Sequence, residues 1–172
     1  LPEQIGPSPV QNANGVIDVL VKDEVEAVAV ARKYLGYFQG PVSEWQCADQ
    51  RLLRHVVPEN RLRVYNVREV LELVADTHSV LELRRGYGAG MVTALARIEG
   101  RPVGIIASQP AYAVGSLTPD ACSKATRLLC LCDAFGLPVV FLQDTPGFMV
   151  GTDVEHDRLL ARAMLFLEAL TL

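Results

Sequence analysis

Val103-Gly104-Ile105-Ile106-Ala107 and Val139-Val140-Phe141-Leu142 are two short, uninterrupted apolar runs. Runs of this kind are typical of strands that are buried on both faces of a parallel sheet. Thr118-Pro119, between them, is typical of a helix start, and Gly136 with Pro138 is typical of a helix end. The apolar residues in this interval have helical spacing: Ala121, Ala125, Leu128, Leu129, Cys132 and Phe135. Residues 103–142 therefore predict a β-α-β unit in an α/β fold.

The sequence on either side extends this unit. Glu99-Gly100-Arg101-Pro102 is a turn signal that joins a strand over 91–98 to the strand at 103–107 as a hairpin. Upstream, Asn66 with Glu69 predicts the start of a helix over 67–76, and residues 79–83 predict another strand. Downstream, Thr152-Asp153-Val154-Glu155 fits a capping box that opens a helix running to the end of the chain.

The first third of the chain is less regular. Residues 1–14 predict a loop or an entering tail, and residues 16–21 predict a short strand. Residues 23–38 predict an amphipathic helix that Asp23 caps, with an apolar stripe formed by Val25, Val28, Ala31, Leu35 and Phe38. Residues 40–65 form a long irregular connection, which is either a subdomain boundary or surface wrapping.

Composition excludes several classes of protein. The 172 residues carry 16 Lys and Arg against 20 Asp and Glu, a formal net charge of −4, which argues against a nucleic-acid partner. No apolar run approaches the ~18 residues of a membrane span, and no signal peptide is visible. The four cysteines form no CxxC pair and the three histidines are scattered, so we expect no metal site and reduced thiols, which suits a cytoplasmic protein. A chain that starts without Met and stops in a helical pattern is expected to be a piece of a longer protein.

Three places are candidates for chemistry. Ser108-Gln109-Pro110 and the segment from Asp144 to Gly151 each follow a predicted parallel strand, where α/β sheets bind ligands. The plainer interpretations are an ordinary connecting loop for the first and a cap on the core for the second. A set of basic residues could hold a phosphorylated cofactor, although such sets are more often a solvated surface: Arg51, Arg54, Arg61, Arg63, Arg84, Arg85, Arg101, Lys124 and Arg127. The sequence has no G-x-S-x-G elbow and no P-loop, and spacing suggests no catalytic triad. If the protein is an enzyme, backbone N–H groups are expected to matter more than a side-chain base.

An ordered series of motifs resembles the carboxyltransferase (β) subunits of biotin-dependent acyl-CoA carboxylases, the propionyl-CoA carboxylase type above all. The motifs span nearly the whole chain: Asn14–Asp18, Tyr34–Phe38, Val64–Arg68, Leu81–Leu83, Val92–Gly104, Cys132–Pro138 and Asp144–Gly151. The resemblance implies a crotonase-like (ClpP/crotonase) fold of ββα units, present here in part. It divides the chain into the end of an N-terminal domain (1–40), a linker (41–65) and the first half of a C-terminal domain (66–172).

The resemblance also implies an activity, carboxyl transfer from carboxybiotin to the α-carbon of an acyl-CoA. Biotin would act as the base, and glycine amides outside this segment would form the two oxyanion holes. Pro146, Gly147 and Phe148 would line the biotin-side pocket, with Gln109 and Pro110 near it, and no residue here would be catalytic. The partners would be a biotin carboxylase or biotin carrier and further carboxyltransferase subunits in a homo-oligomer. The fragment alone is expected to be inactive and poorly stable, because its sheet edges are open.

The chain departs from the family pattern at Ser108, where Asn is usual, at Thr118, where Asp is common, and at Ala161-Arg162-Ala163, where Arg-His is usual. These departures motivate an alternative, a non-catalytic assembly module or truncated paralogue. Further alternatives are a decarboxylase subunit of the same fold and, less in keeping with Asp144–Phe148, another member of the crotonase superfamily.

Overall fold

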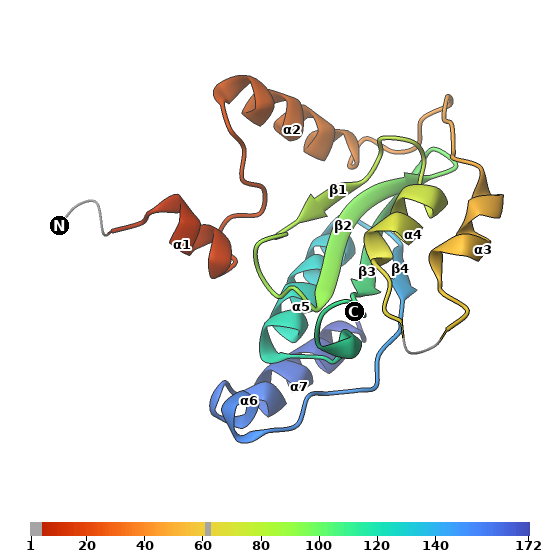
Figure 1. Ribbon diagram of the computed structural model, residues 1–172. Helices are drawn as coiled ribbons and strands as arrows, with labels where there is room; N and C mark the ends of the chain where they lie inside the picture. The colour runs from red at the N-terminus through yellow and green to blue at the C-terminus, as the bar shows by residue number, and fades with distance from the viewer. Residues whose placement is uncertain (1–4, 61–62) are drawn as a thin grey trace.

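The computed structural model describes residues 5–60 and 63–172, and its centre is one mixed sheet with the strand order β1-β2-β3-β4 (Figure 1). The strands are β1 Leu81–Leu83, β2 Met91–Ile98, β3 Arg101–Ser108 and β4 Val139–Leu142. The α-helices are α1 Ser8–Ala13, α2 Glu24–Gly36, α3 Leu53–Val56, α4 Val67–Val74, α5 Pro119–Ala134, α6 Thr152–His156 and α7 Leu159–Ala169. Short 3₁₀ helices occupy Gln50–Leu52 and Ala113–Gly115.

The predicted hairpin is confirmed. β2 and β3 pair antiparallel from Met91↔Ser108 to Ile98↔Arg101. Glu99 and Gly100 between them both have positive φ angles, of 51° and 75°, as a two-residue hairpin turn requires. The Asp76 carboxylate accepts hydrogen bonds from both of their N–H groups, at 2.9 and 2.7 Å. A buried acceptor thus fixes the register of the hairpin.

The predicted β-α-β unit is also confirmed. The Thr118 hydroxyl caps α5 by accepting from the N–H of Ala121 at 3.2 Å, and Pro119 is the first helical residue. β4 pairs parallel to β3, from Gly104↔Val139 to Ala107↔Leu142. The carboxyl ends of the two strands therefore lie next to each other.

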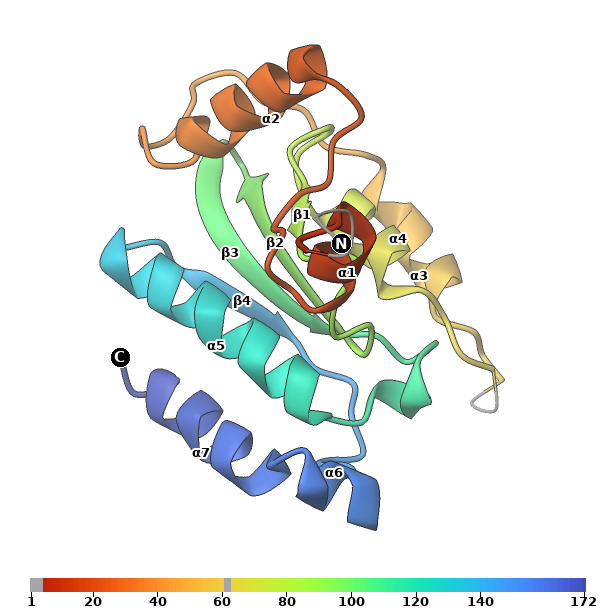
Figure 2. The ribbon, with the colours of Figure 1, turned by 90° about the vertical axis from the view of Figure 1, so that its left-hand side faces the viewer.

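Helices cover both faces of the sheet, as Figure 2 shows, with α5 and α7 on one face and α4 on the other. Leu95 and Ile106 belong to the core under α5 and α7, whereas Val92 and Ile105 belong to the core under α4. β2 and β3 are buried over almost their whole length, since alternate residues enter opposite cores. This explains why their sequences read as continuous apolar runs.

The segment around α2 is held to the sheet by apolar packing of Val30, Tyr34 and Phe38 against the core and by hydrogen bonds to backbone carbonyls. Lys33 Nζ donates to the carbonyls of His78 and Val80, both at 2.8 Å. The Arg97 guanidinium donates to the carbonyls of Gly36 and Gly40, at 2.7 and 3.0 Å. Two long cationic side chains thus cross this junction and bind backbone carbonyls on its other side.

Four expectations about the ends of the chain are corrected. Residues 16–21 form no strand, because the N–H groups of Val16 and Ile17 donate back to the carbonyl of Gln11. Residues 8–13 of the predicted tail are helical; residues 1–4 lie outside the described part. Thr152 does not cap a helix that runs to the end of the chain, because Arg158 has a left-handed φ of 61° and divides it into α6 and α7.

The fourth correction concerns α2. Asp23 caps it as predicted, with its carboxylate accepting from the N–H of Glu26 at 2.8 Å. Most of the predicted apolar stripe does not face the core, however, because Val25, Val28 and Leu35 are exposed, and of the large apolar side chains in the stripe Phe38 packs against the core. Val30 and Tyr34, on another side of the helix, pack against the core instead.

The predicted linker, residues 41–65, contains one turn of 3₁₀ helix and α3, so it is less irregular than expected. The division into residues 1–40, 41–65 and 66–172 stays a prediction. Among residues 5–60 and 63–172, no helix is both long and apolar enough to span a bilayer.

Candidate functional site

The two loops that follow β3 and β4 are joined to each other. The N–H of Leu117 donates to the carbonyl of Gly147 at 2.9 Å, and the N–H of Met149 donates to the carbonyl of Leu117 at 3.0 Å. Leu117 and Phe148 thereby form an isolated parallel bridge. Two loops that the sequence singled out separately therefore form one structure at the carboxyl edge of the sheet.

Gly115 permits the close approach of these loops. Its φ is 77°, and a Cβ at this position would lie 2.3 Å from the carbonyl oxygen of Asp144. Any other residue would be strained in this conformation and would push the two loops apart. The glycine thus fixes how near the first loop comes to the end of β4.

A mostly apolar pocket of about 450 Å³ opens beside these loops, between the ends of β3 and β4 and helix α7. Ser108 and Gln143 are its polar lining residues, and Phe148, which is 42% exposed, forms part of its wall. The remaining lining residues are all apolar: Met91, Ile106, Leu117, Phe141, Leu142, Phe166, Leu167 and Leu170. Among residues 5–60 and 63–172, those that line this pocket carry no ionisable side chain, so its described lining suits binding rather than acid–base chemistry.

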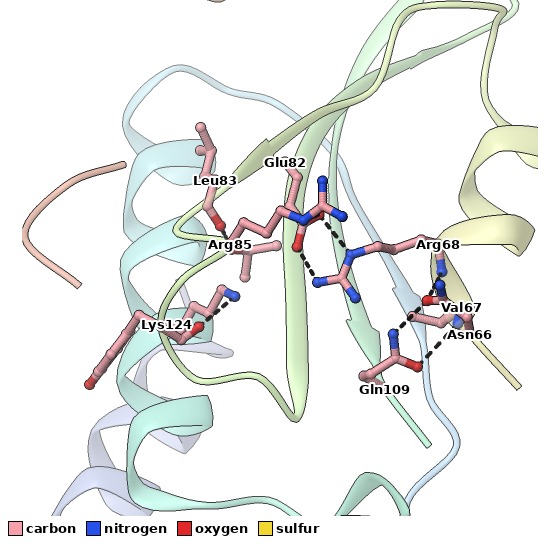
Figure 3. A network of polar contacts seen from close by, with 10 residues as sticks. Asn66, Val67, Arg68, Glu82, Leu83, Arg85, Gln109 and Lys124 are labelled. Carbon is pink, nitrogen blue, oxygen red and sulfur yellow. Dashed lines mark hydrogen bonds and ion pairs between the residues drawn. The ribbon is translucent and has the colours of Figure 1, made fainter. Parts of the chain in front are cut away.

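The five predicted site residues fall into two groups. Phe148 lines the pocket, and Pro146 and Gly147 precede it in the same loop, where Pro146 is exposed and no atom lies within 4 Å of a Cβ built on Gly147. Gln109 and Pro110 are buried instead. The amide of Gln109 is already engaged, since Nε2 donates to Asn66 Oδ1 at 2.6 Å and Oε1 accepts from the N–H of Val67 at 3.2 Å (Figure 3).

Tyr65 and Asn66 belong to this site, although spacing alone did not single them out. The Tyr65 hydroxyl donates to Asp144 Oδ2 at 2.9 Å, and burial together with this carboxylate raises the pKa of Tyr65 to about 12. Asn66 caps α4 by accepting from the N–H of Arg68 at 3.2 Å. Asn66 was predicted as the cap of this helix, whereas the only sequence signal of Tyr65 is its place inside the motif Val64–Arg68.

The described basic residues of the third candidate do not all converge on one site. Arg51 pairs with Asp49, Arg84 and Arg127 share Asp18, and Arg85 approaches Glu82. Arg61 lies outside the described residues. The side chains of Arg51, Arg85 and Arg127 are exposed, as expected for a solvated surface, whereas Arg84 is buried.

Arg84 and Lys124 are exceptions, because Arg84 is 7% exposed and Lys124 is only 1% exposed. Lys124 Nζ donates to the carbonyl of Tyr87 at 2.8 Å (Figure 3), and burial lowers its pKa to about 8. It borders a second pocket of about 470 Å³, together with Arg84, Arg127 and the inner side of α2. All three basic groups there are engaged by protein acceptors, so this pocket offers no evident anion site.

The chain is a crotonase-like α/β protein. Its sheet consists of a hairpin followed by a β-α-β crossover, and a pocket lies at the carboxyl edge of the parallel strands. The model of the carboxyl transferase domain family matches residues 2–171. The chain therefore belongs to the carboxyl transferase domain family.

Similar proteins agree with this assignment. The biotin-dependent acetyl-/propionyl-coenzyme A carboxylase beta5 subunit of Mycobacterium tuberculosis (strain ATCC 25618 / H37Rv) is 37% identical over 130 residues, which are 76% of this chain and 24% of that protein. A single-chain, multi-domain long-chain acyl-CoA carboxylase superimposes with a TM-score of 0.93 at 50% identity, covering 96% of this chain and 17% of that one. The transcarboxylase 12S hexamer, with methylmalonyl-CoA and methylmalonic acid bound, has a TM-score of 0.86 at 31% identity, covering 97% of this chain and 34% of that one. The chain thus spans about a third or less of the proteins it matches.

Proposed function

We propose that this chain is part of a carboxyltransferase that moves a carboxyl group from carboxybiotin to the α-carbon of an acyl-CoA. The observation that carries the proposal is the match to the long-chain acyl-CoA carboxylase, at 50% identity over 96% of the chain. Carboxybiotin, carried by a partner subunit or domain, would supply the carboxyl group, and the acyl-CoA would receive it.

The apolar pocket fits the uncharged ring system of biotin. Phe148 offers a partly exposed aromatic wall, while Ser108 and Gln143 offer hydrogen-bonding groups. Gly147 has open space where a side chain would stand, so a ligand can approach the backbone there. In this proposal Pro146, Gly147 and Phe148 line the biotin-side pocket, with Gln109 and Pro110 near it.

These residues bind and orient the reactants rather than transfer protons. The absence of ionisable side chains from the described lining of the pocket supports a reaction in which this segment supplies no general base. Such a pocket acts by excluding water and by fixing the approach of the donor to the acceptor.

The relatives also suggest the partners. The mycobacterial relative is described as biotin-dependent, and the 12S transcarboxylase is described as a hexamer. We propose that the working form of this protein is a homo-oligomer that receives carboxybiotin from a biotin carboxylase or biotin carrier. A cytoplasmic location stays a prediction.

The test uses the full-length protein that contains this chain, mixed with its biotin carboxylase and biotinylated carrier. Radiolabelled bicarbonate with ATP and a series of acyl-CoAs, from acetyl to long-chain, should give acid-stable label in at least one acyl-CoA.

Phe148→Ala should raise the KM for the carrier, by about tenfold if it removes one aromatic contact. A protein that binds carboxyltransferase subunits but labels no acyl-CoA would favour the assembly-module alternative, and loss of label from carboxylated acyl-CoA would favour a decarboxylase.

A further inference from the structure

Tyr65 and Asn66 are adjacent in the sequence, yet each contacts a different loop of the site. The Tyr65 hydroxyl donates to Oδ2 of Asp144, the second residue after β4, at 2.9 Å. Asn66 Oδ1 accepts from Nε2 of Gln109, the first residue after β3, at 2.6 Å. One dipeptide at the start of α4 thus holds the loops that follow both parallel strands.

The loop from Asp144 to Phe148 is fixed at its two ends. At its far end, Gly147 and Met149 pair with the backbone of Leu117. At its near end, the Asp144 side chain is held by Tyr65. Between these points Thr145 Oγ1 is hydrogen-bonded to the backbone N–H and carbonyl of Gly147 in the same loop, and Pro146 is exposed. The course of the loop past the pocket therefore depends on both anchors.

Tyr65, which holds the near end of the loop, directly precedes a helix that is packed firmly against the sheet. Val67 and Leu71 of α4 are 2% and 1% exposed, and they pack against the face of the sheet opposite α5. Asn66 caps the same helix, and the N–H of Val67 donates to Gln109. Tyr65 itself is half-buried, and burial together with the Asp144 carboxylate raises the pKa of its phenol to about 12, so the protonated, donating form is favoured.

We propose that Tyr65 is a positioning residue of the biotin-side loop: its hydroxyl, through Asp144, sets the place of Phe148 against the biotin ring. This inference rests on the proposed function. A displacement of about 1 Å in a reacting site lowers rates by up to about 100-fold, so a single lost contact behind a binding loop has a measurable effect. The effect is expected on biotin binding and not on acyl-CoA binding.

The experiment measures carboxyl transfer to free biotin from the carboxylated form of the acyl-CoA that the full-length wild-type enzyme prefers. Tyr65→Phe and Asp144→Ala each remove the contact, and both should raise the KM for biotin about 5- to 20-fold, with the KM for the acyl-CoA within twofold of wild type. The double variant should have a KM for biotin no higher than that of either single variant, because all three proteins lack the same hydrogen bond. Asp144→Asn keeps an acceptor oxygen and should restore near-wild-type KM. Tyr34→Phe is the matched control, because Tyr34 lies on α2, away from the strand ends. It should leave both KM values unchanged.

Hydrogen exchange of the peptide covering residues 143–149 gives a readout that does not depend on turnover. Tyr65→Phe should speed exchange in this peptide and leave the peptides of β2 and β3 unchanged. An unchanged KM for biotin in Tyr65→Phe, or equal increases in both KM values, would overturn the inference while leaving the proposed function in place. An inactive wild-type enzyme that shows the same faster exchange in Tyr65→Phe would instead overturn the proposed function and, with it, the role in biotin binding.

Discussion

Gln109 Nε2 donates a 2.6 Å hydrogen bond to Asn66 Oδ1, across 43 residues of sequence, while Gln109 Oε1 accepts from the N–H of Val67. Gln109 is 4% exposed, so both partners would lose a buried contact if its amide were removed. We expect Gln109→Met, which keeps the shape of the side chain, to lower the free energy of unfolding by about 1–3 kcal/mol. Denaturant titration measures this. Gln39→Met, at an exposed position, is the control and should stay within about 0.5 kcal/mol of wild type.

Lys124 makes stability depend on pH in a specific direction. Burial lowers its pKa from 10.5 to about 8, so between these values the unfolded state binds more protons than the folded state. Stability from this group therefore rises as pH increases from about 8 to 10.5, and that gain is absent below pH 8. We expect wild type to gain on the order of 1–3 kcal/mol relative to Lys124→Met across this interval. Equal pH dependence of the two proteins in chemical denaturation would contradict a buried, destabilised ammonium.

Two glycines with similar backbone conformations separate strain from steric clash. Gly100 and Gly136 have φ angles of 75° and 63°, but a Cβ on Gly100 would lie 2.3 Å from the carbonyl oxygen of Val42, whereas nothing lies within 4 Å at Gly136. Gly136→Ala should cost about 1 kcal/mol from the left-handed backbone alone. Gly100→Ala should cost about 3 kcal/mol, because the backbone around Val42 must also move. Thermal unfolding of the two variants measures the difference. If Gly100→Ala and Gly136→Ala lose the same amount of stability, the close approach of Val42 to Gly100 is not needed for the fold.

Gly104 and Cys132 test how β3 packs under α5. A Cβ on Gly104 would lie 2.4 Å from Cys132 Sγ, and Gly104 has an ordinary φ, so overpacking is the only cost expected there. Gly104→Ala should destabilise the protein by about 1–3 kcal/mol. Adding Cys132→Ala removes the sulfur and should recover most of this loss, which makes the pair strongly non-additive. Additive losses in the double-mutant cycle would mean that the strand and helix separate rather than share one space.

The sequence predicted the central fold well because the signals there are local. The hairpin turn, the Thr118 cap and the Gly136-Pro138 helix end each depend on a few neighbouring residues. Most of the apolar stripe of α2 was predicted wrongly because burial of a helix face is decided by contacts that are distant in sequence. Periodicity shows that Val25 and Val28 share a face, but the helix also has apolar groups at Val30 and Tyr34, and only tertiary contact decides which set is covered.

The site was predictable in outline and not in its connections. Strand ends in α/β folds pointed to the loops at Gln109 and Phe148, and the motifs pointed to the family. The contact between Tyr65 and Asp144 spans 79 residues, and no periodicity or spacing links the two. The buried, structural engagement of Gln109 was likewise invisible, since a Gln in a loop has the same sequence signal whether it faces a ligand or the protein.

The order of the strands in the sheet also bears on how the chain folds. Each strand pairs with its neighbour in the sequence, so the sheet can assemble stepwise without waiting for distant segments to meet. The β2–β3 hairpin closes the shortest loop and carries the longest ladder, which makes it the natural nucleus. β4 can join only after α5 has crossed over the sheet, because its parallel pairing with β3 needs that connection. The carboxyl edge, where the two candidate loops meet, is accordingly expected to be the last part of this sheet to form and the first to open.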